Sequence, residues 1–152
     1  ESFRKFTPDC AQSDIQHCSE EALINTYDNT IVYTDHVLAG LIRVLENSQI
    51  EQTQMMYVSD HGESLGESGL YLHGFPYAIA PASQTTVPFL YWRNGAIVSE
   101  NSCSNHNREL FSHDNIFDTF LGATSVISNT YKPERDMLSH CLGQQYEQIG
   151  QP

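Results

Sequence analysis

Apolar residues recur at helical spacing in the first third of the chain. Seven positions follow one another at steps of three and four, on one face of a helix: Leu23, Tyr27, Ile31, Thr34, Leu38, Leu41 and Leu45. Ser19 and the acidic pair Glu20 and Glu21 have the composition of an N-cap and a first turn. The sequence therefore predicts a long helix that begins after Ser19 and ends at Asn47, preceded by a loop over residues 1–18.

Two short apolar runs, residues 55–58 and 87–92, predict strands. Pro88 lies at the start of the second run, where it cannot complete a hydrogen-bond ladder. Between the runs, residues 62–86 contain four glycines and two prolines without a sustained period. They predict a long loop, and a long loop inside a compact domain is more often functional than idle.

A second helix is predicted after Ser112 and ends at Gly122. Its apolar residues share one face: Ile116, Phe117, Phe120 and Leu121. From Tyr131 onward the chain is irregular and polar. The order helix, strand, loop, strand, helix is typical of an α/β protein with a mostly parallel sheet. Because two strands are too few for such a sheet to stand alone, the chain is expected to be part of a larger domain.

Charge and length exclude several classes of function. The 152 residues contain 7 Lys and Arg against 19 Asp and Glu, for a net charge of −12. This acidity argues against a nucleic-acid-binding surface, which needs clustered basic residues. No apolar run approaches the roughly 20 residues of a transmembrane helix. The sequence also has no signal-peptide pattern at its N-terminus.

Four cysteines bear on the compartment: Cys10, Cys18, Cys103 and Cys141. They allow three pairings, among which the sequence cannot choose. Cys10 and Cys18 bracket a short polar loop that a disulfide closes easily, and Cys103 and Cys141 remain as a second pair. A zinc site with His17 beside Cys18 is the alternative, although no C-x-x-C spacing accompanies it. Small-loop disulfides are typical of oxidising compartments, which favours the periplasm or the exterior.

The polar residues after the first strand form the candidate site. Asp60 and His61 lie where the strand ends, and ligands of α/β proteins bind beyond such ends. Gly62 gives the backbone the freedom to turn there, so that both side chains can reach one ion. A carboxylate with an imidazole suits Zn²⁺ and also Mn²⁺. His73 follows twelve residues later, across a loop that can fold back over the site.

Other polar residues have less specific expected roles. Glu63 either orients a ligand or contacts substrate, or it is a solvated carboxylate. Asp28 and Asn29, inside the long helix, are expected on an exposed face, with bonding to loop backbone as the alternative. The remaining histidines are expected at the surface or at helix ends: His17, His36, His106, His113 and His140.

The run Ser59-Asp60-His61-Gly62-Glu63-Ser64-Leu65-Gly66-Glu67, with residues 69–74 and 76–78, resembles the lipid A phosphoethanolamine transferases of Gram-negative bacteria. This family includes the transferable colistin-resistance enzymes and belongs to the sulfatase-like branch of the alkaline-phosphatase superfamily. The resemblance continues in residues 3–8, in Cys10 and Cys18, in residues 25–31 and 114–119, and in the tail through Cys141.

The resemblance implies a sulfatase-like α/β fold and specific roles for site residues. Asp60 and His61 become ligands of the catalytic zinc, and His73 faces the phosphoryl group or a second zinc and can supply a proton. The family's threonine nucleophile, a zinc-binding glutamate and a further histidine lie upstream of Glu1. Residues 1–152 are thus expected to be the C-terminal portion of the catalytic domain, inactive by itself.

The resemblance also implies partners and a location. Phosphatidylethanolamine is the expected donor and a lipid A phosphate the acceptor, with a covalent threonine intermediate between them. The parent enzyme is expected to be a monomer on the periplasmic face of the inner membrane, anchored by an N-terminal membrane domain and associated with polymyxin resistance. The alternatives are a sulfatase-like hydrolase, a phosphoglycerol transferase, and a metal-free binding domain on the same scaffold.

Overall fold

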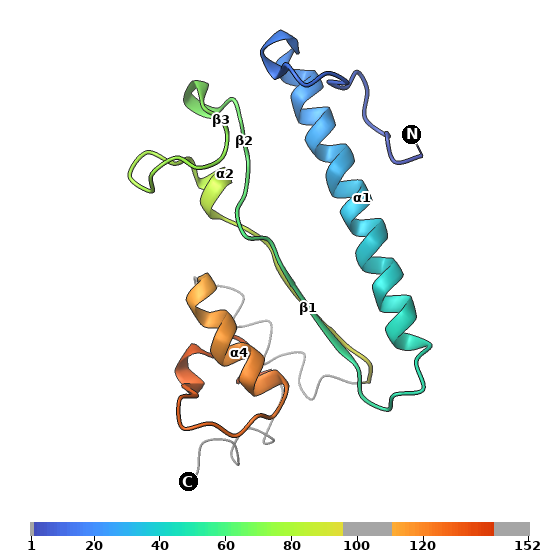
Figure 1. Cartoon of the computed structure of the whole chain (residues 1–152), viewed down its shortest axis with the longest axis vertical. Helices are drawn as coiled ribbons and strands as arrows, with labels where there is room; N and C mark the ends of the chain where they lie inside the picture. Colours follow the sequence, from blue (N-terminus) through green and yellow to red (C-terminus); the bar gives the residue numbers. More distant parts are fainter. Residues whose placement is uncertain (1, 96–110, 142–152) are drawn as a thin grey trace. The chain divides into compact units, whose positions relative to one another are not determined.

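The computed structural model describes residues 2–95 and 111–141. The chain divides into two compact units, residues 1–94 and 95–152 (Figure 1). Cys103, His106 and the last eleven residues, 142–152, lie outside the described residues, so the expected Cys103–Cys141 pairing is not described. In the described part of the chain, no helix is both long enough and apolar enough to cross a membrane.

The long helix of the first unit is α1, Glu20–Glu46. Ser19 is its N-cap, and the Ser19 hydroxyl accepts a hydrogen bond from the Ala22 N–H at 3.2 Å. Glu20 and Glu21 occupy the first turn, where the helix dipole favours negative charge. The predicted helix is therefore confirmed, together with the reason why it begins after Ser19.

Polar residues on α1 hold the N-terminal loop. The Asn29 side chain is buried; its oxygen accepts hydrogen bonds from the N–H groups of Lys5 at 2.7 Å and Phe6 at 3.0 Å. Its amide nitrogen donates to the Phe6 carbonyl at 2.9 Å, and the Thr26 hydroxyl accepts from the Cys10 N–H at 2.8 Å. The expected exposed face is therefore wrong for Asn29. Its side chain bonds the loop backbone, which was the alternative interpretation, because a carboxamide can serve backbone donors and acceptors together.

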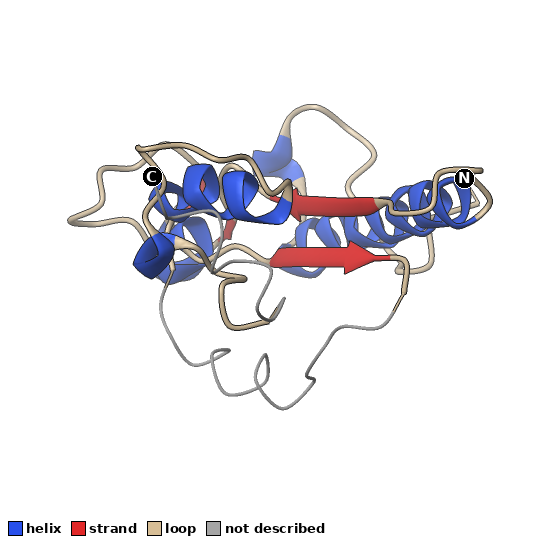
Figure 2. Ribbon diagram, turned by 90° about the horizontal axis from the view of Figure 1, so that it is seen from below, coloured by secondary structure: helices blue, strands red, loops and turns tan. Residues whose placement is uncertain are grey.

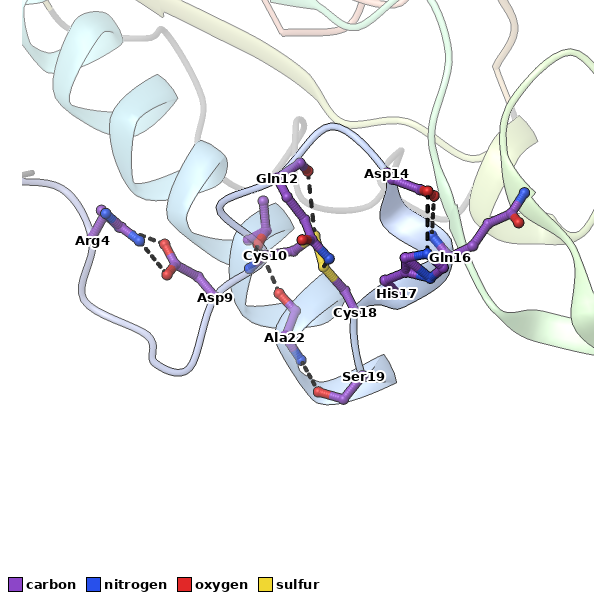
Figure 3. The surroundings of a disulfide bond; sticks show 11 residues. Arg4, Asp9, Cys10, Gln12, Asp14, Gln16, His17, Cys18, Ser19 and Ala22 are labelled. Atoms are coloured by element: carbon purple, nitrogen blue, oxygen red, sulfur yellow. Dashed lines mark hydrogen bonds and ion pairs between the residues drawn. A yellow bond between two sulfur atoms is a disulfide. The ribbon is translucent and has the colours of Figure 1, made fainter.

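The loop before α1 is closed by the predicted disulfide. Cys10 and Cys18 are bonded, with their Cα atoms 5.7 Å apart (Figure 3). A short 3₁₀-helix, Ile15–His17, lies inside the closed loop, and the Asp14 carboxylate accepts from the Gln16 N–H at its start. The zinc alternative for these cysteines is excluded in the structure, because both sulfur atoms are used in the disulfide.

Two strands of the first unit pair with each other. Strand β1, Gln54–Val58, and strand β4, Phe89–Arg93, are antiparallel (Figure 2). In their register Met56 lies opposite Tyr91. Strand β4 begins just after Pro88, as its missing N–H predicts. The sheet was expected to be mostly parallel, and this pair departs from that expectation. A parallel pair needs a long crossover, usually helical, whereas α2, Ala82–Thr85, is the only α-helix described between these strands.

The predicted long loop contains a small hairpin. Strand β2, Ser64–Leu65, pairs antiparallel with β3, Tyr71–Leu72, and a 3₁₀-turn, Glu67–Gly69, connects them. Gly66 adopts a φ of 126°, which side chains rarely tolerate, so glycine is required where the hairpin turns. The loop is therefore organised by backbone pairing that the aperiodic sequence did not reveal.

The described part of the second unit is built around α4, Ile116–Ala123. Ser112 is a helix cap, as predicted, but it caps the 3₁₀-turn His113–Asn115, and the α-helix itself begins one turn later than predicted. The buried face of α4 is partly polar: the Asp118 carboxylate accepts from the Lys132 N–H at 2.7 Å, and the Thr119 hydroxyl accepts from the Met137 N–H at 3.0 Å. The segment that was expected to be irregular is thus bonded to α4 at Lys132 and Met137, and Cys141 beyond it is buried.

Asp136 is a buried carboxylate in this second unit. It accepts hydrogen bonds from the Tyr131 hydroxyl at 2.9 Å and from the Leu138 N–H at 2.8 Å. Burial raises the pKa of Asp136 above its usual value, because the charged form loses water, and these two hydrogen bonds only partly oppose the shift. Burial likewise raises the pKa of Tyr131, with the hydrogen bond to Asp136 as the next cause.

The raised pKa of Asp136 predicts a pH dependence of stability. The folded state binds this proton more tightly than the unfolded state, so ionised Asp136 destabilises the fold above its folded pKa. Between that pKa and the unfolded value of 3.8, lowering the pH restores stability. In thermal melts between about pH 3.5 and 7, we expect the unchanged protein to gain stability as the pH falls and Asp136→Asn to lack this gain. Asp35→Asn, at an exposed position, is the control and should keep the gain. Equal pH profiles for Asp136→Asn and the unchanged protein would contradict the prediction.

Candidate metal centre

Asp60 and His61 follow directly after β1, as the sequence predicted. The backbone N–H of His61 donates to the Asp60 carboxylate at 3.1 Å, and the Ser59 hydroxyl donates to the His61 carbonyl at 2.8 Å. The Nδ1 atom of His61 lies 2.9 Å from the Gly62 carbonyl oxygen. Because a carbonyl can only accept, Nδ1 carries the proton in this bond, and Nε2 keeps the lone pair that a metal needs.

The two predicted ligands converge. The Nε2 atom of His61 lies 3.8 Å from Oδ2 of Asp60. Zinc binds nitrogen and carboxylate oxygen at about 2.0–2.2 Å, so two ligands of one ion can lie at most about 4.3 Å apart. The Asp60 side chain is 87% exposed among the described residues, so its carboxylate is open to a further partner.

His73 and Glu63 lie next to each other and beside His61. The Nδ1 atom of His73 lies 3.2 and 3.3 Å from the two oxygens of the Glu63 carboxylate. The rings of His61 and His73 stack with centroids 3.8 Å apart and planes 28° apart. Ligand atoms of His61, Glu63 and His73 lie within 4.8 Å of one another, so a small movement of these side chains would bring them to the spacing of ligands on one metal ion. Two of the three site residues predicted from the sequence, His61 and His73, therefore meet together with Glu63, whereas Asp60 lies beside His61 and is not one of these three.

The β2–β3 hairpin explains why Glu63 and His73 meet. Ser64 pairs with Leu72 and Leu65 with Tyr71. Continuing that register outward by one residue places Glu63 opposite His73, at the distance of cross-strand neighbours. Sequence reasoning left the role of Glu63 open, because the register depends on the turn at Gly66 and not on the spacing of the two residues.

Glu67 completes the hairpin without joining the cluster. Hydrogen bonds from its own N–H, from the Ser83 side chain and from the Leu65 N–H hold the pKa of Glu67 below its usual value. The Leu65 bond is 2.7 Å long. Glu67 therefore stabilises the turn as a fixed carboxylate. The other histidines in the described ranges are exposed, as predicted: His17, His36, His113 and His140.

The chain is similar to known phosphoethanolamine transferases. It is 46% identical over 146 residues to phosphoethanolamine transferase EptA of Escherichia coli strain K12, covering 91% of this chain and 27% of that protein. It is 39% identical over 133 residues to phosphatidylethanolamine transferase Mcr-1 of Escherichia coli, covering 87% of this chain and 24% of that protein. The chain thus spans about a quarter of the length of these relatives.

A solved structure shows the same fold. The integral membrane protein lipooligosaccharide phosphoethanolamine transferase A from Neisseria meningitidis matches with a TM-score of 0.85 and 43% identity, over 93% of this chain and 28% of that one. The likeness confirms the sulfatase-like α/β fold that the sequence resemblance implied. The sulfatase family profile matches residues 1–126. The chain therefore belongs to the sulfatase family, in which the relatives it resembles are phosphoethanolamine transferases.

Proposed function

We propose that residues 1–152 are the C-terminal portion of the catalytic domain of a zinc-dependent phosphoethanolamine transferase. The observation that carries this proposal is that His61, beyond the end of β1, lies beside Asp60 and stacks on His73, which Glu63 contacts, in a chain of this family. The donor set supports a metal: an imidazole beside a carboxylate suits zinc, which takes nitrogen and oxygen ligands. Asp60 and His61 would hold the ion, together with ligands from outside this segment.

The residues of the cluster have distinct proposed roles. Bound zinc supplies a Lewis acid that stabilises charge on the transferring phosphoryl oxygens. The Gly62 carbonyl holds His61 with Nε2 toward the ion, and Glu63 accepts from Nδ1 of His73. His73 then exchanges a proton through Nε2, which makes it the candidate catalytic residue that protonates the leaving oxygen.

The proposed reaction has two steps. A threonine oxygen from outside this segment attacks the phosphorus of phosphatidylethanolamine; the bond to the diacylglycerol oxygen breaks, and that oxygen takes a proton. A lipid A phosphate oxygen then displaces the threonine and receives the phosphoethanolamine group. The parent enzyme is proposed as a monomer anchored in the inner membrane, with its active site on the periplasmic face and a role in polymyxin resistance. The relative solved as an integral membrane protein supports this placement.

Transfer of a labelled head group tests the proposal. The polypeptide extended to the length of its relatives is incubated with phosphatidylethanolamine labelled in its ethanolamine and with lipid A. We expect label on lipid A, no transfer after chelation, and recovery with zinc. The 152 residues alone are expected to be inactive because the threonine is missing.

Other products would identify the alternatives. Label released to water as free phosphoethanolamine would indicate a hydrolase. Transfer of phosphoglycerol from phosphatidylglycerol instead would indicate a phosphoglycerol transferase. If the extended polypeptide showed no turnover and bound no metal, a binding domain on the same scaffold would be favoured. Each of these three results contradicts the proposal.

A further inference from the structure

A buried glutamine lies beside the metal centre. Gln84 belongs to α2, and only 6% of its surface is exposed. Its side-chain Nε2 donates a 2.8 Å hydrogen bond to the hydroxyl of Ser64, which is 1% exposed. A buried amide donor without a partner destabilises a protein, so this bond constrains both residues.

The backbone of Gln84 also holds Gly62, the residue that precedes Glu63. The carbonyl of Gln84 accepts a 2.9 Å hydrogen bond from the N–H of Gly62. Glu63 therefore lies between two residues that are both bonded to Gln84, one through its side chain and one through its main chain. The two bonds fix the position and direction of the backbone from which the Glu63 carboxylate extends.

Close contacts with α2 leave residues 62–64 little freedom to move. A Cβ atom at Gly62 would lie 1.9 Å from the carbonyl oxygen of Ser83. The hydroxyls of Ser83 and Ser64 are 3.4 Å apart. The backbone at Gly62 thus lies directly against α2, and a shift of α2 would carry Glu63 with it.

We propose that Gln84 is a positioning residue that holds the Glu63 carboxylate on Nδ1 of His73. The hydrogen bonds of Gln84 go to the residues on either side of Glu63, so Gln84 acts through Glu63. The Glu63–His73 distance of 3.2 Å selects the ring nitrogen that exchanges protons, so a displaced Glu63 releases His73 from its productive orientation. This inference deepens the proposed function and rests on it.

The kinetics of single and double variants of the extended polypeptide test the proposal. Gln84→Leu keeps a side chain of similar volume and removes its hydrogen bond to Ser64. We expect kcat to fall about 10–100-fold with KM and zinc content nearly unchanged. In a Glu63→Gln background, where the carboxylate is already lost, Gln84→Leu should have little further effect. Ser64→Ala removes the same hydrogen bond with a smaller change in the side chain. It replaces Gln84→Leu in the experiment if that variant folds poorly. Gln49→Leu, at an exposed glutamine, is the matched control and should retain full activity.

A second readout does not depend on turnover. The ¹⁵N resonances of the His73 ring report whether Nδ1–H is hydrogen-bonded. We expect Gln84→Leu and Ser64→Ala to shift them toward the values of Glu63→Gln, including in a protein that proves inactive as a transferase. Equal losses of kcat with and without Glu63, or unchanged His73 resonances in folded Gln84→Leu and Ser64→Ala, would overturn the positioning role. A wild-type protein without transfer activity would overturn the proposed function instead.

Discussion

Replacing His61 by alanine is expected to remove the bound metal and to abolish phosphoethanolamine transfer. The Nε2 atom of His61 has its lone pair free, because Nδ1 donates to the Gly62 carbonyl, and it lies 3.8 Å from the Asp60 carboxylate. Removing this ligand leaves too few donors in the cluster to hold zinc. A metal ion contributes several kcal/mol to stabilising the transition state, so the rate should fall at least about a thousandfold.

Metal content and transfer are measured on the same preparation of the extended polypeptide. Elemental analysis gives the zinc per protein, and the labelled head-group assay gives the rate. His17→Ala is the matched control, because His17 is also exposed but lies in the disulfide-closed loop and belongs to no metal cluster of the described residues. Full zinc occupancy in folded His61→Ala would contradict the assignment of this ligand.

Replacing Gly62 by alanine is expected to reduce transfer about 100-fold, the size of effect that a displacement of about 1 Å produces in an active site. The added Cβ would lie 1.9 Å from the Ser83 carbonyl oxygen and 3.0 Å from its carbon. Both are backbone atoms, so no rotation of a side chain relieves the contact. The turn that carries His61 and Glu63 must therefore move away from α2, and the hydrogen bond from Gly62 to Gln84 is lost.

A second glycine provides the matched control. In Gly40→Ala the nearest atom to the new Cβ is Nη2 of Arg43, at 3.8 Å, and Gly40 lies inside α1. This change should leave activity intact and stabilise the helix by about 0.5–1 kcal/mol. Thermal melts and zinc content distinguish a displaced site from an unfolded one. Normal transfer by Gly62→Ala would show that the anchoring contact has no catalytic consequence.

Local sequence determined the elements whose signals are local. The N-cap at Ser19, the acidic first turn and the apolar spacing specify α1 within a short window, so its beginning and end were predictable. The strand ends were predictable for the same kind of reason, since Pro88 cannot donate to a ladder and β4 begins after it. The short loop between Cys10 and Cys18 likewise predicted its own disulfide.

Side chains that bond distant backbone could not be placed in this way. Asn29, inside a helix, has the sequence signature of a solvent-facing residue, yet it bonds a loop more than twenty residues away. Asp118 and Thr119 on α4 similarly bond the backbone of a later segment. The local sequence around a polar residue is the same whether its hydrogen-bond partner is water or a distant peptide group.

The sequence by itself singled out three residues of the proposed site: Asp60 and His61 at a strand end, and His73 beyond a glycine-rich loop. Only the tertiary structure decided that Glu63 faces His73, that β1 and β4 run antiparallel, and that Gln84 anchors both sides of Glu63. The physical reason is that strand register and burial depend on contacts between residues far apart in the chain. Local composition and spacing do not encode such contacts, whereas helix caps, turns and the ligand preferences of metals are properties of the residues themselves.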